Sequence, residues 1–450
     1  MRPVLTVEQL MRRTANRVFE TLFNEGARIT IVDSPPGAGK TDLVEKTAAL
    51  AVQQLGLSVA VVTPTVEQSF DLIRRLVADF DRLPIEILLS ESRQLPADLA
   101  ADPRVPVPIS MPRALRRGRS IVIGTVDKFF FGSNDAGLQG FDVMVCDEAY
   151  QVAYRKFAPL LTLAEQFLFV GDPGQLPPLS RVELARFEGA PSKVHWAVPK
   201  ELLRLHPEIP VIQLPASRRL PQDTIDFLQP SFYPTLPFQS SAPVQQRRLS
   251  VRNRGFGGLI DIAVDRLCRG ETVVSLILPP SPTLTPDFDE EVAETMADVV
   301  RRIIDRGMTM GAGLRLTGDN IGCVDAHVAS GANVTKALRA RTLGSEIMVG
   351  TPEIWQGLQR PVMVVKHPLS GLKKLDRFAL DPGRCCVMLS RHQAGCVVVA
   401  RDGVEQVLDA HQHDCESTPM AAVDAEWNGW RAHRTLWDGL RSGGRLLSAN

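Results

Sequence analysis

Residues 29–41 read ITIVDSPPGAGKT, a β-branched run followed by a loop that is rich in glycine and proline. A short, continuous apolar run is typical of a strand that is buried on both faces of a parallel sheet. Beyond the loop, apolar residues recur with helical spacing at Leu43, Ala48, Ala51 and Leu55. The segment therefore predicts a strand, a tight loop and a helix in direct succession.

Similar apolar runs recur through the first half of the chain, and each ends in small or acidic residues. They read VAVVT at 59–63, IVIGT at 121–125, VMVCD at 143–147 and FLFVG at 167–171. Between the first two of these runs, one apolar helix face is formed by Val66, Phe70, Ile73, Val77 and Phe80. Strands that alternate with helices in this way predict a doubly wound α/β domain.

The second half repeats the pattern after a middle section, residues 207–258, that is rich in proline and arginine. Strands are predicted at 272–278, 320–324, 346–350, 361–365 and 395–400, and a helix is predicted from Asp289. We therefore predict two α/β domains, at residues 1–215 and 216–415, and a helical tail at residues 416–450. Ligands of open α/β sheets bind beyond the carboxyl ends of the strands, so we expect a cleft between the two domains.

The bulk composition limits the possible partners. The 450 residues are 44% hydrophobic, and 51 Lys and Arg balance 51 Asp and Glu, so any contact with nucleic acid must be local. The chain start has no signal-peptide core and no stretch approaches the ~20 apolar residues of a membrane span, so we expect a soluble, cytoplasmic protein with no membrane partner. The seven cysteines form no CxxC pair, which predicts a reduced compartment and no zinc site.

The glycine-rich loop, SPPGAGKT at Ser34–Thr41, fits a Walker A motif in all but its first position, where Ser34 replaces glycine. Its backbone amides would cradle phosphates and the following helix would add its dipole. The nucleotide contacts are predicted at Pro36, Gly37, Ala38, Gly39, Lys40 and Thr41. Lys40 would reach the β- and γ-phosphates of ATP, and Thr41 would bind Mg²⁺. The alternative is a chance glycine-rich turn.

A pair of acids, Asp147 and Glu148 in DEAYQ, closes the strand VMVC. An aspartate at such a strand end can hold Mg²⁺, and a neighbouring glutamate can polarise the attacking water. This pair predicts hydrolysis rather than transfer to a metabolite. The alternative is an acidic strand end that caps the next helix.

Together with DEAYQ, the sequence FVGDPGQLPP at 169–178 resembles motifs II and III of superfamily 1 helicases. The resemblance is to the 5′-to-3′ branch, which includes the nonsense-mediated decay helicase and related DNA-processing helicases. It implies two RecA-like P-loop domains with an ATP cleft between them. It also implies that Gln175 senses the γ-phosphate and that Asp172 is the acidic residue of the same loop.

Further matches follow in the family's order. Residues 61–76 resemble motif Ia and residues 121–129 the next strand and loop, which implies nucleic-acid contacts at Thr63, Pro64 and Thr125. Residues 214–221 are similar to motif IV, residues 349–359 to motif V and residues 380–400 to motif VI. The implied roles are a γ-phosphate arginine at Arg218, a nucleic-acid contact at Gln356 and an arginine finger at Arg391. Departures from the family pattern stand at Ser217, Gln359, Cys385 and Cys386.

Several weaker sequence features are each compatible with two interpretations. In LTVEQL, Gln9 resembles the family's adenine-reading glutamine, or it is an ordinary exposed helix residue. Two arginine clusters either contact a nucleic-acid strand or form solvated faces: Arg113, Arg116, Arg117 and Arg119, and Arg247, Arg248, Arg252 and Arg254. The tail tryptophans Trp427, Trp430 and Trp437 favour packing over base stacking. Histidines such as His195, His206 and His392 have no metal-ligand spacing.

These residues predict an ATP hydrolase of the helicase kind that translocates on or unwinds single-stranded DNA or RNA. The competing hypothesis is a nucleotide-gated switch or scaffold subunit, which uses the same ATPase cycle to regulate protein partners in a nucleic-acid-processing complex without processive movement. ATP turnover with and without single-stranded nucleic acid distinguishes the two.

Overall fold

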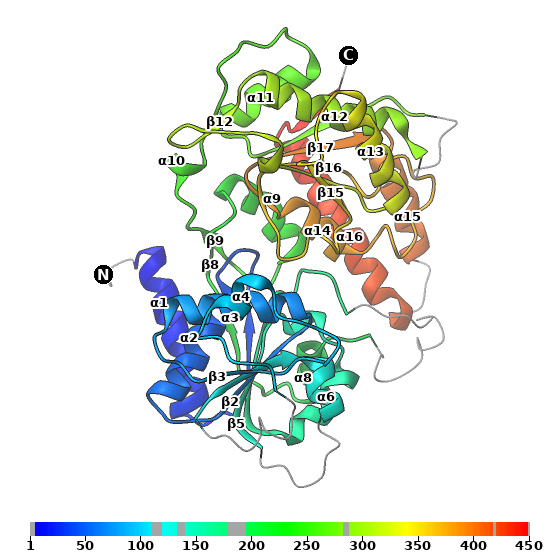
Figure 1. Cartoon of the computed structure of the whole chain (residues 1–450). Helices are drawn as coiled ribbons and strands as arrows, with labels where there is room; N and C mark the ends of the chain where they lie inside the picture. Colours follow the sequence, from blue (N-terminus) through cyan, green and yellow to red (C-terminus); the bar gives the residue numbers. More distant parts are fainter. Residues whose placement is uncertain are drawn as a thin grey trace. The chain divides into compact units, whose positions relative to one another are not determined.

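The structure is a computed structural model that describes residues 5–109, 119–132, 140–178, 195–281, 288–416 and 420–448. The chain divides into two compact units. Unit 1 comprises Met1–Pro173 and Pro177–Pro215, and unit 2 comprises Gly174–Leu176 and Ala216–Asn450. Each unit has its own parallel sheet flanked by helices (Figure 1).

Unit 1 is built on a seven-stranded sheet in the order β3-β4-β2-β5-β6-β1-β7, in which neighbouring strands are parallel. The strands are β1 (Ile29–Asp33), β2 (Val59–Thr63), β3 (Ile85–Ile87), β4 (Ile121–Thr125), β5 (Phe141–Cys146), β6 (Ala164–Gly171) and β7 (Val211–Gln213). The α-helices are α1 (Val7–Phe19), α2 (Lys40–Gln53), α3 (Val66–Asp79), α4 (Ala97–Ala101), α6 (Val126–Gly132), α7 (Tyr154–Phe157) and α8 (Val198–Leu205). Short π and 3₁₀ turns lie at Glu20–Asn24, Ala149–Gln151 and Ala158–Thr162.

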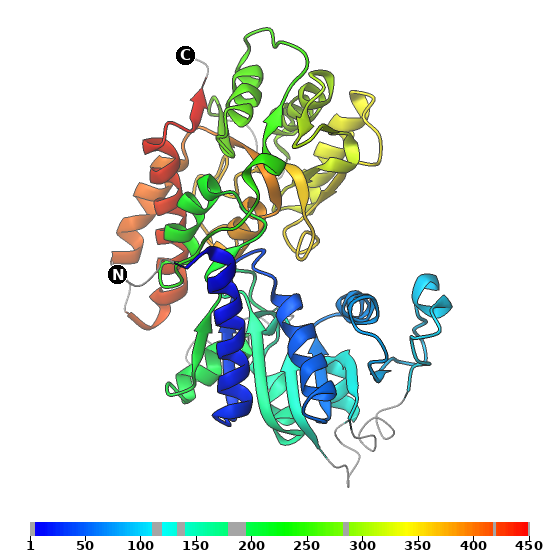
Figure 2. The same ribbon diagram turned by 90° about the vertical axis from the view of Figure 1, so that its left-hand side faces the viewer.

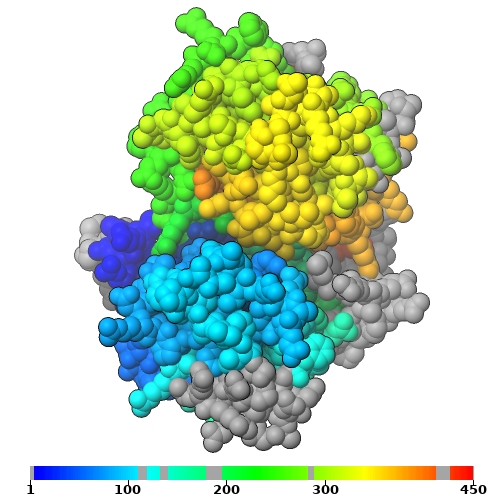
Figure 3. All heavy atoms as spheres, in the orientation of Figure 1, coloured from blue at the N-terminus to red at the C-terminus, as the bar shows by residue number. Residues whose placement is uncertain are grey.

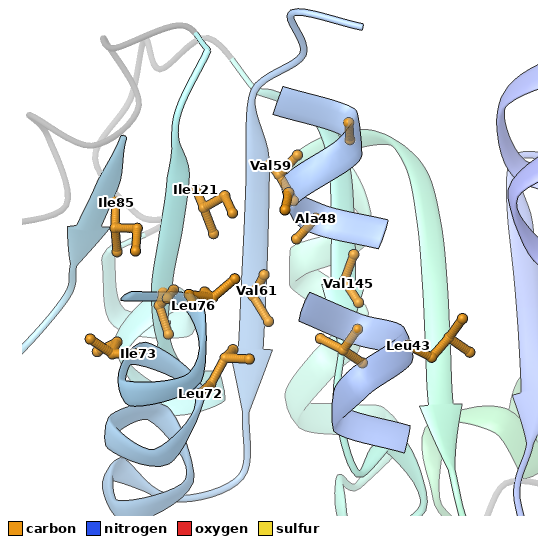
Figure 4. Packing of buried hydrophobic residues seen from close by; sticks show 14 of the residues in the cluster. Leu43, Ala48, Val59, Val61, Leu72, Ile73, Leu76, Ile85, Ile121 and Val145 are labelled. Carbon is orange, nitrogen blue, oxygen red and sulfur yellow. The ribbon is translucent and has the colours of Figure 1, made fainter. Parts of the chain in front are cut away.

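Both faces of this sheet are buried, which explains why its strands read as continuous apolar runs. On one face α2 and α3 cover the strands, and Leu43 of α2 packs in one cluster with Val59 and Val61 of β2 (Figure 4). The intervening residues Ala60 and Val62 point the other way, because successive side chains of a strand alternate. They join a second cluster beneath α6, α7 and α8. The P-loop strand β1 thus lies inside a fully covered sheet.

Unit 2 is built on a six-stranded parallel sheet in the order β15-β14-β16-β17-β11-β18. Its strands are β11 (Val273–Leu278), β14 (Ile321–Val324), β15 (Met348–Gly350), β16 (Arg360–Lys366), β17 (His392–Arg401) and β18 (Leu446–Ser448). Two smaller sheets are formed by β8 (Ala216–Ser217) with β9 (Gln239–Ser240), and by β10 (Leu249–Ser250), β12 (Thr309–Met310) and β13 (Leu314–Arg315). The helices are α9 (Gln222–Phe232), α10 (Val244–Arg247), α11 (Leu259–Cys268), α12 (Glu290–Asp305), α13 (Val328–Ala340), α14 (Pro382–Leu389), α15 (Val404–Glu416) and α16 (Met420–Ser442), and a 3₁₀ turn lies at Gly318–Asn320.

The second sheet is also covered on both faces (Figure 2). Val362 and Val364 of β16 pack beneath α11, α12 and α13, whereas Met363 and Val365 pack toward α9, α14 and α16. In the space-filling view the yellow-green atoms of the α12 region and the yellow atoms of the α13 region lie on the face of unit 2 that is turned to the viewer (Figure 3). This alternation confirms the predicted fold class of two parallel α/β sheets flanked by helices.

The segment predicted as a helical tail, residues 416–450, is helical over α16, but its end forms strand β18 beside β11. Trp430 and Trp437 are 7% and 3% exposed, which confirms their predicted packing, whereas Trp427 is 37% exposed. The rings of Trp427 and Trp430 stack at 5.0 Å. None of the described helices combines the length and apolar composition that crossing a bilayer requires.

A buried ion pair holds the start of α12 in unit 2 and gives a first prediction. Arg401, 2% exposed, donates two hydrogen bonds to Asp289, which also caps α12 by accepting from the Val292 amide. Asp289→Ala should lower the free energy of unfolding by about 3 kcal/mol, because it leaves a buried guanidinium short of its main partner. Urea unfolding followed by tryptophan fluorescence measures this, since four of the five tryptophans lie in unit 2.

The matched control is Glu291→Ala, because Glu291 binds the same guanidinium at 2.7 Å but is 58% exposed. Its loss should cost under about 1 kcal/mol. Equal effects of the two variants would contradict the view that burial of the Asp289–Arg401 pair makes it important.

A second prediction concerns Glu45 of α2, which is 2% exposed. Burial, reinforced by the charge of Asp42, raises the pKa of Glu45 from 4.5 to about 7. Because the folded state binds this proton more tightly, the resulting stability is fully present below pH 4.5 and is lost as the pH rises through 7. Glu45→Gln should therefore stabilise unit 1 by about 1–2 kcal/mol at pH 8 and have little effect at pH 4.5.

Hydrogen exchange of the α2 amides at the two pH values measures this change. Glu67→Gln is the control, since Glu67 lies on α3 with its side chain 72% exposed and should leave exchange unchanged. If the Glu45→Gln variant is no more stable than the parent protein at pH 8, the raised pKa of Glu45 is wrong.

Candidate functional site

The loop between β1 and α2 has the backbone that a phosphate cradle requires. Gly37 and Gly39 have φ values of +73° and +90°, a left-handed conformation that strongly favours glycine. Ser34 is fully buried, lies outside the left-handed region, and donates its amide hydrogen bond to the carbonyl of Gly171 at 2.9 Å. The replacement of glycine by Ser34 in the Walker A pattern is therefore compatible with the loop.

The side chains that follow the loop meet the acids at the end of β5. The Lys40 ammonium lies 2.9 Å from a carboxylate oxygen of Glu148, with the two side chains 9% and 16% exposed. The Thr41 hydroxyl donates to Asp147 at 3.4 Å. Four residues predicted from the sequence thus come together in unit 1, although more than a hundred positions separate the two pairs.

The backbone of Glu148 is strained. Its φ and ψ of 52° and 43° are left-handed, a conformation that costs a non-glycine residue about 1 kcal/mol or more. It is held by hydrogen bonds on both sides, from its own amide to the Asp147 carboxylate at 2.9 Å and from the Gln151 amide to its carbonyl at 2.8 Å. Backbone strain of this kind is often found at functional sites, where it holds a side chain in a particular orientation.

The cluster carries an excess of negative charge. Burial, and then the charge of Glu148, raise the pKa of Asp147, while Lys40 and the hydrogen bond from Thr41 act in the opposite direction. Two carboxylates facing a single lysine favour a cation nearby. The Thr41 hydroxyl and the Asp147 carboxylate offer oxygen ligands, the type that Mg²⁺ prefers, so these residues fit a magnesium ion.

Two neighbouring side chains, Tyr150 and Asp33, were not predicted as part of the site. The Tyr150 hydroxyl donates to Asp33 at 2.6 Å, and burial raises the pKa of Asp33, with Asp172 adding to the rise. Asp33 ends β1, and Asp172 follows β6, its neighbour in the sheet. Gly171 permits the close approach, because a Cβ there would lie 2.8 Å from the Tyr150 ring. The sequence feature that could have indicated this contact is an acidic residue at the end of each of the two strands, Asp33 after β1 and Asp172 after β6.

The residues predicted to touch nucleic acid in unit 1 lie at the same carboxyl edge of the sheet. Thr63 and Thr125 end the paired strands β2 and β4 and are register partners. Thr63 is fully buried and its hydroxyl is bonded to Ser69 at 2.7 Å, so of this pair of residues only the partly exposed Pro64 is accessible. The Thr125 hydroxyl accepts from the Lys128 amide at 3.3 Å.

The predicted arginines belong to unit 2. Arg391 lies between α14 and β17 and is 1% exposed, and its Nε donates to the Val387 carbonyl at 3.2 Å. Among the described residues, its Nη2 has no hydrogen-bond partner. Arg218 is exposed, whereas its neighbour Arg219 donates to Gln359 at 2.8 Å and to the Ser390 carbonyl at 3.3 Å.

Gln175 and Gln356 also lie in unit 2. The segment Gly174–Leu176 leaves β6 but groups with unit 2, where a Cβ on Gly383 at the start of α14 would lie 2.8 Å from the Gln175 carbonyl. Gln356 is partly buried in the turn after β15.

The weaker predictions fall at the surface or outside the described residues. The Gln9 amide oxygen accepts from the Thr6 amide at 2.9 Å and so forms part of a helix-capping box at α1. Arg113, Arg116 and Arg117 lie outside the described residues, and Arg119 is exposed. In the second cluster Arg247 is partly buried, and the others are exposed: Arg248, Arg252 and Arg254.

A comparison with protein families finds a match over the region that contains the site. The family model of the AAA domain matches residues 12–187, which include Lys40, Thr41, Asp147 and Glu148. No curated protein matches the sequence.

Solved structures similar to this chain include the arterivirus nonstructural protein 10 helicase, at 15% identity and a TM-score of 0.43, with 90% of this chain and 64% of that chain covered. A complex of that helicase with DNA has 14% identity and a TM-score of 0.43, with coverages of 89% and 65%. The E. coli DExH-box NTPase HrpB has 13% identity and a TM-score of 0.42, with coverages of 90% and 42%. The chain spans less than two thirds of the length of each. The region that carries the Lys40–Glu148 cluster is thus similar to AAA-type P-loop domains.

Proposed function

We propose that the protein hydrolyses ATP with Mg²⁺ and uses the cycle to translocate on, or unwind, single-stranded DNA or RNA in the cytoplasm, as a superfamily 1 helicase of the 5′-to-3′ branch. The observation that carries the proposal is the meeting of Lys40 and Thr41 of the P-loop with Glu148 and Asp147 of β5. Phosphate-binding, metal-binding and water-activating groups then stand at one point of unit 1.

Hydrolysis follows from an exchange of partners. The triphosphate of ATP would accept hydrogen bonds from the loop amides of residues 36–41 and would draw the Lys40 ammonium onto its β- and γ-oxygens. Glu148 then loses its partner and is free to accept the proton of the attacking water. Mg²⁺, held by Thr41 and Asp147, would neutralise charge on the β- and γ-phosphates.

Unit 2 is proposed to complete the site with Arg391. Its buried guanidinium has a donor, Nη2, without a partner among the described residues, and such a donor costs free energy until an acceptor arrives. A γ-phosphate oxygen that gains charge in the transition state is a strong acceptor. The proposal requires that Lys40 and Arg391 reach the same nucleotide, with Arg218 as a second phosphate ligand and Gln9 at the adenine.

The motor step is proposed to run through Gln175. Its segment follows β6 of unit 1 in the chain and packs on Gly383 of α14, the helix that leads to Arg391. A glutamine that senses the γ-phosphate would therefore pass the signal to α14. Nucleic acid is proposed to bind near Thr63, Pro64 and Thr125 of unit 1 and Gln356 of unit 2, and its grip would change with the state of the nucleotide.

The first functional prediction is that Lys40→Ala abolishes ATP turnover, and that single-stranded DNA or RNA raises the turnover of the parent protein. Phosphate release measured with and without oligonucleotides tests both statements. Lys46→Ala is the control, since Lys46 lies on the same helix, is 58% exposed and pairs only with Asp42 in the described region.

Two outcomes have distinct meanings. Unaltered turnover in Lys40→Ala would overturn the ATPase site. Turnover that depends on Lys40 but does not respond to either nucleic acid would instead favour a nucleotide-gated switch or scaffold subunit that regulates protein partners.

The second functional prediction concerns the arginine finger. Arg391→Ala should reduce kcat by about 10³-fold or more while largely sparing the affinity for ATP, because the guanidinium acts on transition-state charge. Single-turnover hydrolysis and the binding of a fluorescent ATP analogue measure the two effects. Arg339→Ala, an exposed position on α13, is the control. Unchanged kcat in a folded Arg391→Ala protein would remove the finger from the mechanism.

A further inference from the structure

Three metal-ligating side chains meet inside unit 2, and the ATPase proposal uses none of them. His367 directly follows β16, Cys385 lies on α14 and His433 lies on α16. One ligand atom of each residue lies within 4.8 Å of the ligand atoms of the other two. The three side chains are at most 1% exposed. The chain therefore brings two imidazoles and a thiol together in the buried interior of unit 2, from positions that no short motif connects.

The imidazoles are poorly satisfied by the protein around them. Among the described residues, His367 Nε2 has no hydrogen-bond partner, and the His433 ring has only a weak interaction with the Ala379 backbone. The two rings lie 5.9 Å apart at 68°, and the Trp437 ring lies 5.4 Å from His367. Buried polar atoms are nearly always hydrogen-bonded, so two buried imidazoles that are this poorly satisfied beside a thiol need an explanation.

We propose that His367, Cys385 and His433 bind one zinc-type divalent ion. Two neutral imidazoles and a thiolate are ligands of Zn²⁺, whereas Mg²⁺ and Ca²⁺ take oxygen ligands. Zinc bonds of about 2.0–2.1 Å to nitrogen and 2.3 Å to sulfur place tetrahedral ligand atoms about 3.3–3.6 Å apart. Since the present atoms lie within 4.8 Å of one another, side-chain movements of about 1 Å close the site.

The protons can be followed through binding. Cys385 binds as the thiolate, so one proton leaves the protein for each ion bound. The Leu369 amide donates to His367 Nδ1 at 3.2 Å, which places the proton of a neutral ring on Nε2. Coordination through Nε2 moves that proton to Nδ1, where it would face the Leu369 N–H, so this hydrogen bond is lost and the ring must turn away from that amide when the ion binds.

An ion bound there would link three parts of unit 2. It would tie the end of β16 to α14 and α16, three elements that are far apart in the sequence. Within the described residues, no fourth histidine, cysteine or carboxylate joins the group, so the fourth coordination position is left for a small ligand such as water. The proposal does not depend on ATP hydrolysis.

The test uses the full chain, made without a histidine tag and purified from cells supplied with zinc. Elemental analysis should find about one zinc per chain, and removal by a strong chelator should lower the Tm by about 5 °C or more. Co²⁺ added to the metal-free chain should give a thiolate-to-metal charge-transfer band, which a magnesium site built from Thr41 and Asp147 cannot produce.

Matched variants assign the ligands. Cys385→Ser and His433→Gln should each lose the zinc and the cobalt band. Cys386→Ser should keep both, because the adjacent buried Cys386 contacts the Tyr233 hydroxyl at 3.1 Å and lies outside the ligand group. If a variant fails to fold, the cobalt spectrum and the zinc content of the parent chain still show whether the metal site exists.

The proposal would be overturned if the parent chain bound neither zinc nor cobalt and its Tm did not change on addition of the chelator. That result would favour a buried water among the three side chains. Retention of the cobalt band in Cys385→Ser would overturn it as well.

Discussion

The buried ion pair between Lys40 and Glu148, 2.9 Å long, is the constraint around which unit 1 is arranged. A lysine that is 9% exposed needs a counter-charge, and the left-handed backbone of Glu148 presents that charge at the cost of strain. The pair joins the helix after β1 to the end of β5, across the intervening strand β6. A phosphate that competes for Lys40 therefore changes the partners of both charges at once. The same contact that holds the two segments together can respond to a ligand.

Parallel topology explains why so many polar groups meet at this edge. Strands that all run in one direction place their carboxyl ends along one side of the sheet. Asp33, Thr63 and Asp147 each stand at or just after a strand end, and the strands behind them are mostly apolar and buried. Most polar groups of these strands therefore lie where the strands end. The Tyr150–Asp33 hydrogen bond and the buried Asp172 belong to the same row.

The sequence was sufficient for the features that local patterns encode. Continuous apolar runs predicted the principal strands of both sheets, and the glycine-rich motif predicted the tight loop between β1 and α2. The short strands β3, β7 and β18 carry too few residues for periodicity to identify them. The Thr6–Gln9 capping box was readable from local sequence and was missed, whereas the bond from Tyr150 to Asp33 depends on which segments become neighbours. The meeting of His367, Cys385 and His433 is the extreme case, because ligand spacing along the chain carries no information when three separate elements supply the ligands.

Helix α14 connects the two proposals physically. Its first turn, at Gly383, packs on the Gln175 carbonyl, its middle carries Cys385, and its end leads directly to Arg391. Six of its eight residues are buried, so it has little freedom to bend and must move as a body or not at all. A displacement imposed at Gln175 by the γ-phosphate would then appear at Arg391. An ion that joins Cys385 to β16 and α16 would fix the middle of this helix to the sheet. It would therefore limit how far the helix can move when the proposed nucleotide contacts at its two ends, Gln175 and Arg391, change.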